Sequence, residues 1–263
     1  MLKKRIIPKL LCVEKIFGIQ SKIVLVNTRN FNDMRVIGDP ISQAKIFESQ
    51  ICDELIVLDI RHEKNGLNKG FLETVRRLAS ETFMPLTIGG CVKEEDDFIQ
   101  LLNSGADKVS LNFQALITPE LITKAANKFG SQCVVVSIDH AKDENGVNCI
   151  FDYSRRYISK RCPVVWAKEA VERGAGEILL TDVDRDGGCA GLNLELCEKV
   201  AQEVPVPVVI SGGAGLAQHF VDGFSIGKAA GVAAGTFFAK RDQGPMQVRA
   251  HVANAKIPIR MGF

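Results

Sequence analysis

Short runs of apolar and β-branched residues alternate along the chain with longer segments in which apolar residues recur every three or four positions. The short runs are typical of buried strands, and the longer segments are typical of helices with one buried face. The predicted strands cover residues 5–11, 54–60, 84–88, 108–111, 133–138, 177–181, 206–210 and 230–234. The predicted helices lie near residues 40–50, 69–80, 94–104, 118–129, 164–173, 193–203, 216–226 and 244–254.

Each predicted strand is followed by a helix, which predicts a parallel sheet covered by helices. Eight such units in 263 residues match the size of a single closed (β/α)8 barrel, so residues 1–263 are interpreted as one domain. A doubly wound open sheet is the alternative arrangement of the same elements.

An internal repeat favours the barrel. "DELIVLDI" at 53–60 is similar to "GEILLTDV" at 176–183, and Glu54 and Glu177 are 123 residues apart in the chain. The same offset relates Gly89 to Gly212. The repeat predicts two half-barrels, about residues 1–130 and 131–263, and excludes a solenoid of short repeats.

Two of the predicted strands end in paired glycines, Gly89-Gly90 and Gly212-Gly213. Ligands of such barrels bind at the carboxyl ends of the strands, and a glycine turn can direct backbone N–H groups at an anion. The ends of the following strands, with Asn112 in one half and Ala234 and Gly235 in the other, would complete two cradles. The hypothesis is a ligand with a phosphate at each end, and the alternative is ordinary glycine punctuation in loops.

Composition and charge narrow the class of protein. The net charge of +2 indicates neither a nucleic-acid nor a membrane surface, and the apolar runs are shorter than the ~18 residues of a membrane span. Pro8 and Lys9 interrupt the apolar start, which argues against a signal peptide. Eight cysteines without CxxC spacing indicate reduced thiols and a cytoplasmic protein, and the four scattered histidines predict no metal site. No cofactor is expected.

Several motifs together resemble the HisF family, the cyclase subunit of imidazole glycerol phosphate synthase, along nearly the whole chain. They are "KRIIP", "GDP", "DELIVLDI", "PLTIGG", "GADKVS", "FGSQCVVVSID", "GAGEILLTDVDRDG", "ISGGAG" and "HF". The resemblance implies a (β/α)8 barrel paired with a glutaminase, HisH, whose ammonia passes through the barrel. In the family the ammonia reacts with a bisphosphorylated ribulosyl aminoimidazole carboxamide nucleotide. The products are imidazole glycerol phosphate and an aminoimidazole carboxamide ribotide.

The resemblance also assigns roles to individual residues. The family's charged gate for ammonia is complete as Arg5, Glu54, Lys108 and Glu177, for which a solvated rim of salt bridges is the alternative. Two further residues, Asp107 and Gln132, match positions that face the glutaminase. In the "DRDG" motif, Asp186 and Gly187 match positions near the substrate phosphate.

The catalytic end departs from the family. Cyclisation there uses two aspartates, of which Asp139 is present, whereas Leu11 stands in place of the other. Cys91 and Phe113 also differ from the family pattern near the mouth, while the gate is retained.

Two hypotheses follow, and Leu11 separates them. The first is a HisF paralogue of surface-polysaccharide loci, working with a HisH-like glutaminase and a separate sugar amidotransferase. The second is a functional lyase-type cyclase of histidine biosynthesis. A phosphate-binding barrel of another family, such as the isomerase HisA, would leave the gate unexplained.

Overall fold

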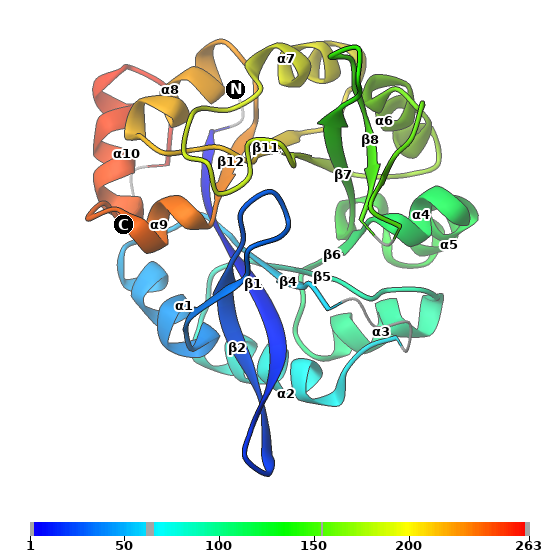
Figure 1. The fold of residues 1–263 in the computed structure, drawn as a ribbon, viewed down its shortest axis with the longest axis vertical. Coiled ribbons are helices and arrows are strands. Elements are labelled where there is room, and N and C mark those ends of the chain that lie inside the picture. The colour runs from blue at the N-terminus through cyan, green and yellow to red at the C-terminus, as the bar shows by residue number, and fades with distance from the viewer. Residues whose placement is uncertain (1–2, 62–65, 154, 261–263) are drawn as a thin grey trace.

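The computed structural model describes residues 3–61, 66–153 and 155–260 and contains a closed eight-stranded parallel barrel surrounded by helices (Figure 1). The barrel closes where β1 pairs with β12, with Arg5 beside Gly231. This confirms the predicted (β/α)8 barrel and excludes the open sheet. The barrel strands are β1 (Arg5–Phe17), β4 (Leu55–Asp59), β5 (Leu86–Gly89), β6 (Lys108–Leu111), β7 (Val134–Lys142), β10 (Glu177–Asp182), β11 (Val208–Ser211) and β12 (Gly231–Ala234).

Eight helices lie close to their predicted positions on the outside of the barrel. They are α1 (Pro40–Ser49), α2 (Lys69–Glu81), α3 (Glu95–Asn103), α5 (Glu120–Phe129), α6 (Pro163–Glu172), α7 (Leu194–Glu203), α8 (Ala217–Ser225) and α10 (Pro245–Asn254). Two five-residue helices, α4 (Phe113–Ile117) and α9 (Thr236–Lys240), were not predicted, because one turn is too short to give a helical period.

Side chains alternate between the two faces of each barrel strand. The outward residues, such as Ile6 and Leu10, pack with the helices in one large core. The inward residues form a small apolar layer inside the barrel, made of Ile7, Ile56, Val135, Leu179, Val209 and Ala233. The barrel is therefore a filled structure with an apolar middle.

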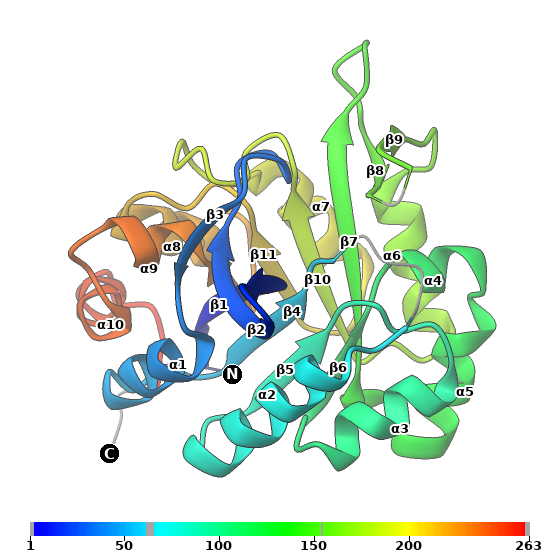
Figure 2. The same cartoon turned by 60° about the horizontal axis from the view of Figure 1, so that its bottom comes forward.

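Two hairpins extend the barrel beyond the predicted strands. The long first loop is in fact a β-hairpin, in which β1 continues antiparallel to β2 (Gln20–Asn27) and β2 pairs with β3 (Arg35–Gly38). Its tip carries the exposed residues Ile16 and Ile19 and projects from the molecule (Figure 1). The second hairpin joins β7 to β8 (Asn148–Asp152), which pairs with β9 (Tyr157–Ile158) and rises above the barrel (Figure 2).

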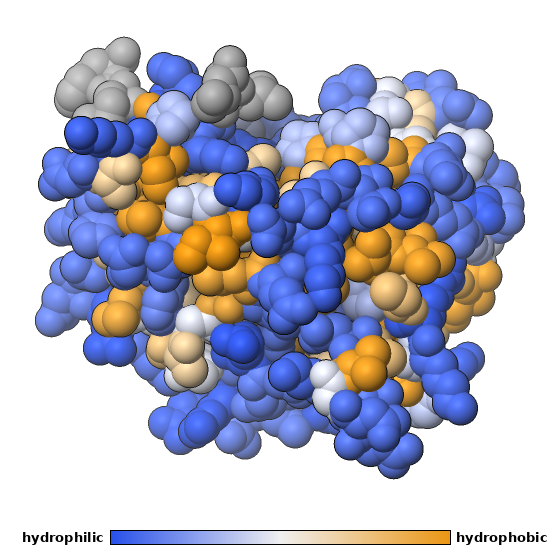
Figure 3. Space-filling view, turned by 90° about the horizontal axis from the view of Figure 1, so that it is seen from above, coloured by the Kyte–Doolittle hydropathy of each residue, from blue (hydrophilic) through white to orange (hydrophobic). Residues whose placement is uncertain are grey.

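The surface and the cysteines agree with the sequence analysis. None of the helices in the described part of the chain is long and apolar enough to span a bilayer. The face in Figure 3 is largely hydrophilic, with its apolar side chains in small separate groups. All eight cysteines are free thiols.

Candidate functional site

A ring of four charged residues closes the base of the barrel, where the strands begin. Arg5 donates through Nη1 to Glu54 (2.7 Å) and also pairs with Glu177. Lys108 Nζ lies 2.9 Å from Glu54 and 2.7 Å from Glu177. The structure therefore brings together all four residues of the predicted gate, and each cation contacts both anions.

Pairing offsets the cost of burying these charges. Burial alone would raise the pKa of Glu177, but the Arg5 and Lys108 cations outweigh it and hold the pKa below its ordinary value. Glu54 gains a further hydrogen bond from Thr87 Oγ1 (2.6 Å). The exposed residues Asp107 and Gln132 lie at the starts of β6 and β7, at the same end of the barrel.

At the opposite end, the predicted second cradle lines a pocket. It is formed by the turn after β11, with Gly212 and Gly213, and by the end of β12, with Ala234 and Gly235. Gly212 and Gly213 have φ of +90° and +103°, a region that glycine adopts without steric cost. A Cβ on Gly213 would lie 2.2 Å from the carbonyl oxygen of Gly191, so the turn requires glycine.

The equivalent turn in the first half is shifted by one residue from the sequence repeat. Leu58 pairs with Gly89, whereas the repeat-related Thr181 pairs with Ser211, so Gly90 is the structural counterpart of Gly212. The counterpart of Gly213 is Cys91, which has a left-handed φ of +57° despite its side chain. Gly89 instead ends β5, where it pairs with Ser110. The two cradles therefore differ in their second turn residue.

The short helices begin at the same place in both halves. α4 follows Asn112, and α9 follows Gly235. A phosphate site made from the loops after the last two barrel strands and a short extra helix is common in this fold. The second cradle has this arrangement, with α9 beginning at Thr236 on the wall of the pocket.

Asp139 is the acid of the mouth. It lies on β7, is 6% exposed, and accepts a hydrogen bond from Asn112 Nδ2 (2.6 Å). Burial raises its pKa to about 6, although the Asn112 hydrogen bond opposes the shift. A carboxyl group that titrates near neutrality is suited to general acid–base chemistry.

Leu11 gives the mouth an apolar wall. It is 9% exposed and belongs to a small cluster with Val13, Val24 and Val26 from the hairpin. Leu11 cannot exchange a proton, and its surroundings would disfavour an ionised group.

Asp186 and Gly187 connect the two halves of the chain over the pocket. Asp186 accepts a hydrogen bond from Thr28 Oγ1 (2.6 Å), and its carbonyl oxygen accepts from the backbone N–H of Asn30 (3.0 Å). Asn30 Nδ2 donates to the carbonyl oxygen of Asp184 (2.9 Å). Gly187 packs against Thr28 so closely that a Cβ would lie 2.2 Å from its carbonyl oxygen.

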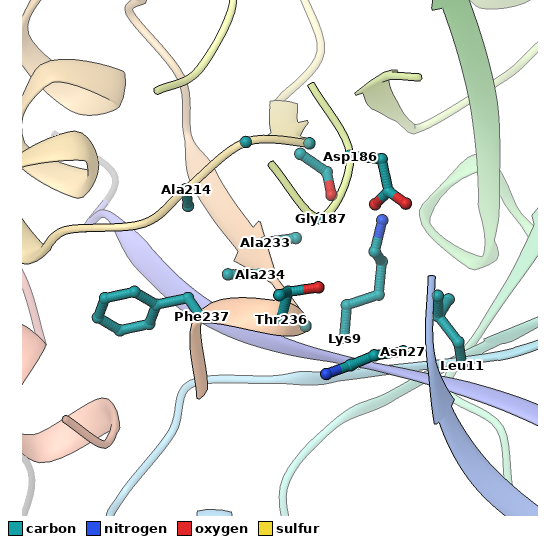
Figure 4. Close-up of a pocket in the computed structure, with 14 residues that line it drawn as sticks. Lys9, Leu11, Asn27, Asp186, Gly187, Ala214, Ala233, Ala234, Thr236 and Phe237 are labelled. Atoms are coloured by element: carbon teal, nitrogen blue, oxygen red, sulfur yellow. The ribbon is translucent and has the colours of Figure 1, made fainter. Parts of the chain in front are cut away.

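The sequence analysis missed Lys9, which projects into the pocket beside these groups (Figure 4). Lys9 is 6% exposed, and burial lowers its pKa. The signal was present in the strand pattern, because Arg5 and Lys9 are four residues apart and so point to the same side of a strand.

The fold and this site define a class, a (β/α)8-barrel protein with the glycine turns typical of phosphate-binding barrels. The model of the family described as histidine biosynthesis protein matches residues 15–243.

Similar proteins narrow the class further. The chain is 44% identical to hisF2 of Prochlorococcus marinus, whose name gives its role as an imidazole glycerol phosphate synthase subunit only provisionally. That match covers 99% of each chain. It is 42% identical to the imidazole glycerol phosphate synthase subunit HisF of Anoxybacillus flavithermus, over 99% of this chain and all of the relative. The Geobacillus kaustophilus subunit HisF is 41% identical over the same shares. The chain belongs to the HisF family.

Proposed function

We propose that this chain is the barrel subunit of a glutamine-dependent amidotransferase. A HisH-like glutaminase docks at the base, and the barrel carries its ammonia from the charged ring to the mouth. The observation that carries the proposal is the contrast between a complete ring at the base, Arg5, Glu54, Lys108 and Glu177, and a mouth with Leu11 facing Asp139.

The lumen between the two ends suits a neutral molecule. Ile7, Leu179 and Val209 belong to an apolar layer between the ring and the pocket. Ammonium would lose its hydration there without compensation, whereas ammonia carries no charge and costs much less to transfer.

The mouth supports a role other than cyclisation by two carboxylates. Leu11 replaces one proton-transfer group, and such a group typically contributes about 10²–10⁴ in rate. A separate sugar amidotransferase then uses the ammonia, which places the complex in the conversion of sugar acetamido groups to acetamidino groups in surface polysaccharides.

A second candidate is the cyclase of histidine biosynthesis. It is favoured by Asp139, which keeps its hydrogen bond from Asn112 and a pKa near neutrality. Relatives at 41–42% identity also carry the name of that synthase.

The test is ammonia-dependent cyclase activity of the purified chain with the family's bisphosphate substrate. The natural chain should show no turnover, and Leu11→Asp should recover part of it, whereas Leu11→Asn, of similar size but without a carboxyl group, should not. Turnover by the natural chain, or growth without histidine when it replaces the histidine enzyme in a deletion strain, would establish the second candidate instead.

Docking of the glutaminase is tested separately at the base. Gln132 is exposed, and its side chain bonds only locally, to the carbonyl oxygen of Phe129 (3.2 Å). Gln132→Arg should therefore weaken co-purification with a co-expressed HisH-like glutaminase. The control Lys240→Glu changes an exposed residue of α9, after the mouth end of β12, and should leave co-purification unchanged. Equal recovery with both variants would remove the base as the docking surface.

A further inference from the structure

Lys9 is a buried amine inside the barrel that the ammonia route does not use. It follows Arg5 and Ile7 on the inward side of β1, where its neighbour in the layer below is apolar. Its side chain rises into the pocket toward the carboxylate of Asp186 (Figure 4).

The amine has no bonded partner. Across residues 3–61, 66–153 and 155–260, no hydrogen bond or ion pair involves Lys9 Nζ. The two carboxylates that act on it, Asp186 and Asp139, are bonded elsewhere, to Thr28 and to Asn112. A lysine that served only to stabilise the fold would be expected to make an ion pair, because an unpaired buried charge is costly.

A second polar group of the same pocket is also unsatisfied. Ser211 Oγ is buried, and no described residue lies within hydrogen-bonding distance of it. The turn of Gly212 and Gly213 and the end of β12 adjoin both groups. The pocket thus combines a site typical of phosphate binding with a free amine and a free hydroxyl.

Burial gives this amine the character of a nucleophile. Desolvation lowers the pKa of Lys9, against the opposing effect of the two carboxylates, so that more of the amine is unprotonated. Asp139, whose pKa is raised to about 6, can both donate and accept a proton beside it.

We propose that Lys9 forms an imine with the carbonyl carbon of a small phosphorylated aldehyde or ketone whose phosphate is held by the turn at Gly212 and Gly213. The neutral amine attacks the carbonyl carbon, and the C=O bond opens to a carbinolamine. Both protons of the attacking amine end in the water that leaves as the C=N bond forms. Asp139 carries a proton between nitrogen and oxygen, and no oxidant or reductant is needed. This inference goes beyond ammonia transfer and does not depend on a glutaminase.

The experiment is reductive trapping on the full chain. The protein is incubated with D-ribulose 5-phosphate and sodium cyanoborohydride, which converts an imine to a stable secondary amine, and the adduct is mapped by peptide mass spectrometry. The adduct should be found at Lys9 in large excess over the exposed lysines. It should be lost in Lys9→Met, lost with D-ribulose, and suppressed by inorganic phosphate. Asp139→Asn should slow its formation.

Two results would overturn the proposal. One is an adduct distributed evenly over exposed lysines such as Lys199. The other is no adduct at all from a natural chain that circular dichroism shows to be folded. If Lys9→Met then weakens binding of inorganic phosphate, Lys9 is an anion ligand and not a nucleophile. Lys9→Met removes a buried charge and should fold, so loss of its adduct reports on chemistry.

Discussion

The two ends of the barrel treat buried charge in opposite ways. At the base, Arg5 and Lys108 each contact both Glu54 and Glu177. At the mouth, Lys9 and Asp139 lie near each other, but within the described residues neither forms an ion pair. Paired charges have low reactivity, whereas unpaired buried groups have shifted pKa values and are candidates for chemistry. The comparison indicates that the base has a positional role and the mouth a chemical one.

The largest expected effect comes from breaking a pair at the base. Glu177→Gln leaves Arg5 and Lys108 with one anion instead of two, and removing one partner from a buried pair typically costs about 3–5 kcal/mol. The free energy of unfolding in urea at pH 7 measures the loss.

The matched control is an exposed pair far from the ring. Glu195→Gln removes a partner of Lys199 (2.7 Å) on the surface of α7, where no measurable change is expected. If Glu177→Gln proved as stable as this control, the ring would not be a structural network.

At the mouth, removal of charge should have the opposite sign. The pKa of Asp139 is raised from 3.8 to about 6, so its ionisation penalises the fold above pH 6 and not below pH 4. Asp139→Asn should therefore gain stability relative to the natural chain as pH rises from 4 to 7, by on the order of 2 kcal/mol. Urea unfolding at the two pH values measures the difference, and a gap between the two proteins that stays constant with pH would contradict it.

Lys9→Met gives a smaller effect with the reverse pH dependence. Burial lowers the pKa of Lys9, so the natural chain is penalised at neutral pH and the penalty disappears as pH approaches the ordinary pKa of lysine. The variant should be more stable by about 1–2 kcal/mol at pH 7, since replacing buried charge by an apolar side chain is often stabilising. Thermal unfolding between pH 7 and pH 10 tests this, and a destabilised variant would mean that Lys9 is part of the structural framework.

The strands and long helices could be predicted because their periodic patterns extend over several residues. The short helices α4 and α9 could not, because they are one turn long and are placed by the strands before them. The long first loop was read as irregular, although the pairing of Cys12 with Leu25 continues a regular strand ladder.

The candidate site was predicted less completely than the fold. Sequence alone located the four residues of the ring, because they begin the strands, and the structure brings them together. It did not reveal that Cys91 rather than Gly90 is the counterpart of Gly213, because the register depends on pairing between strands. Lys9 was overlooked since attention to glycine turns and acids left its inward position unexamined. The phosphate roles of the turns and the half-barrel origin stay predictions.

The hydrogen bonds from Thr28 and Asn30 to the loop at Asp184–Asp186 have a consequence for molecular traffic. They join segments more than 150 residues apart in the chain across one side of the pocket. A molecule seated beneath must leave by another side or wait until these bonds open together. Loss of the Thr28 hydroxyl would therefore alter how long an occupant stays more than how tightly it is held at equilibrium.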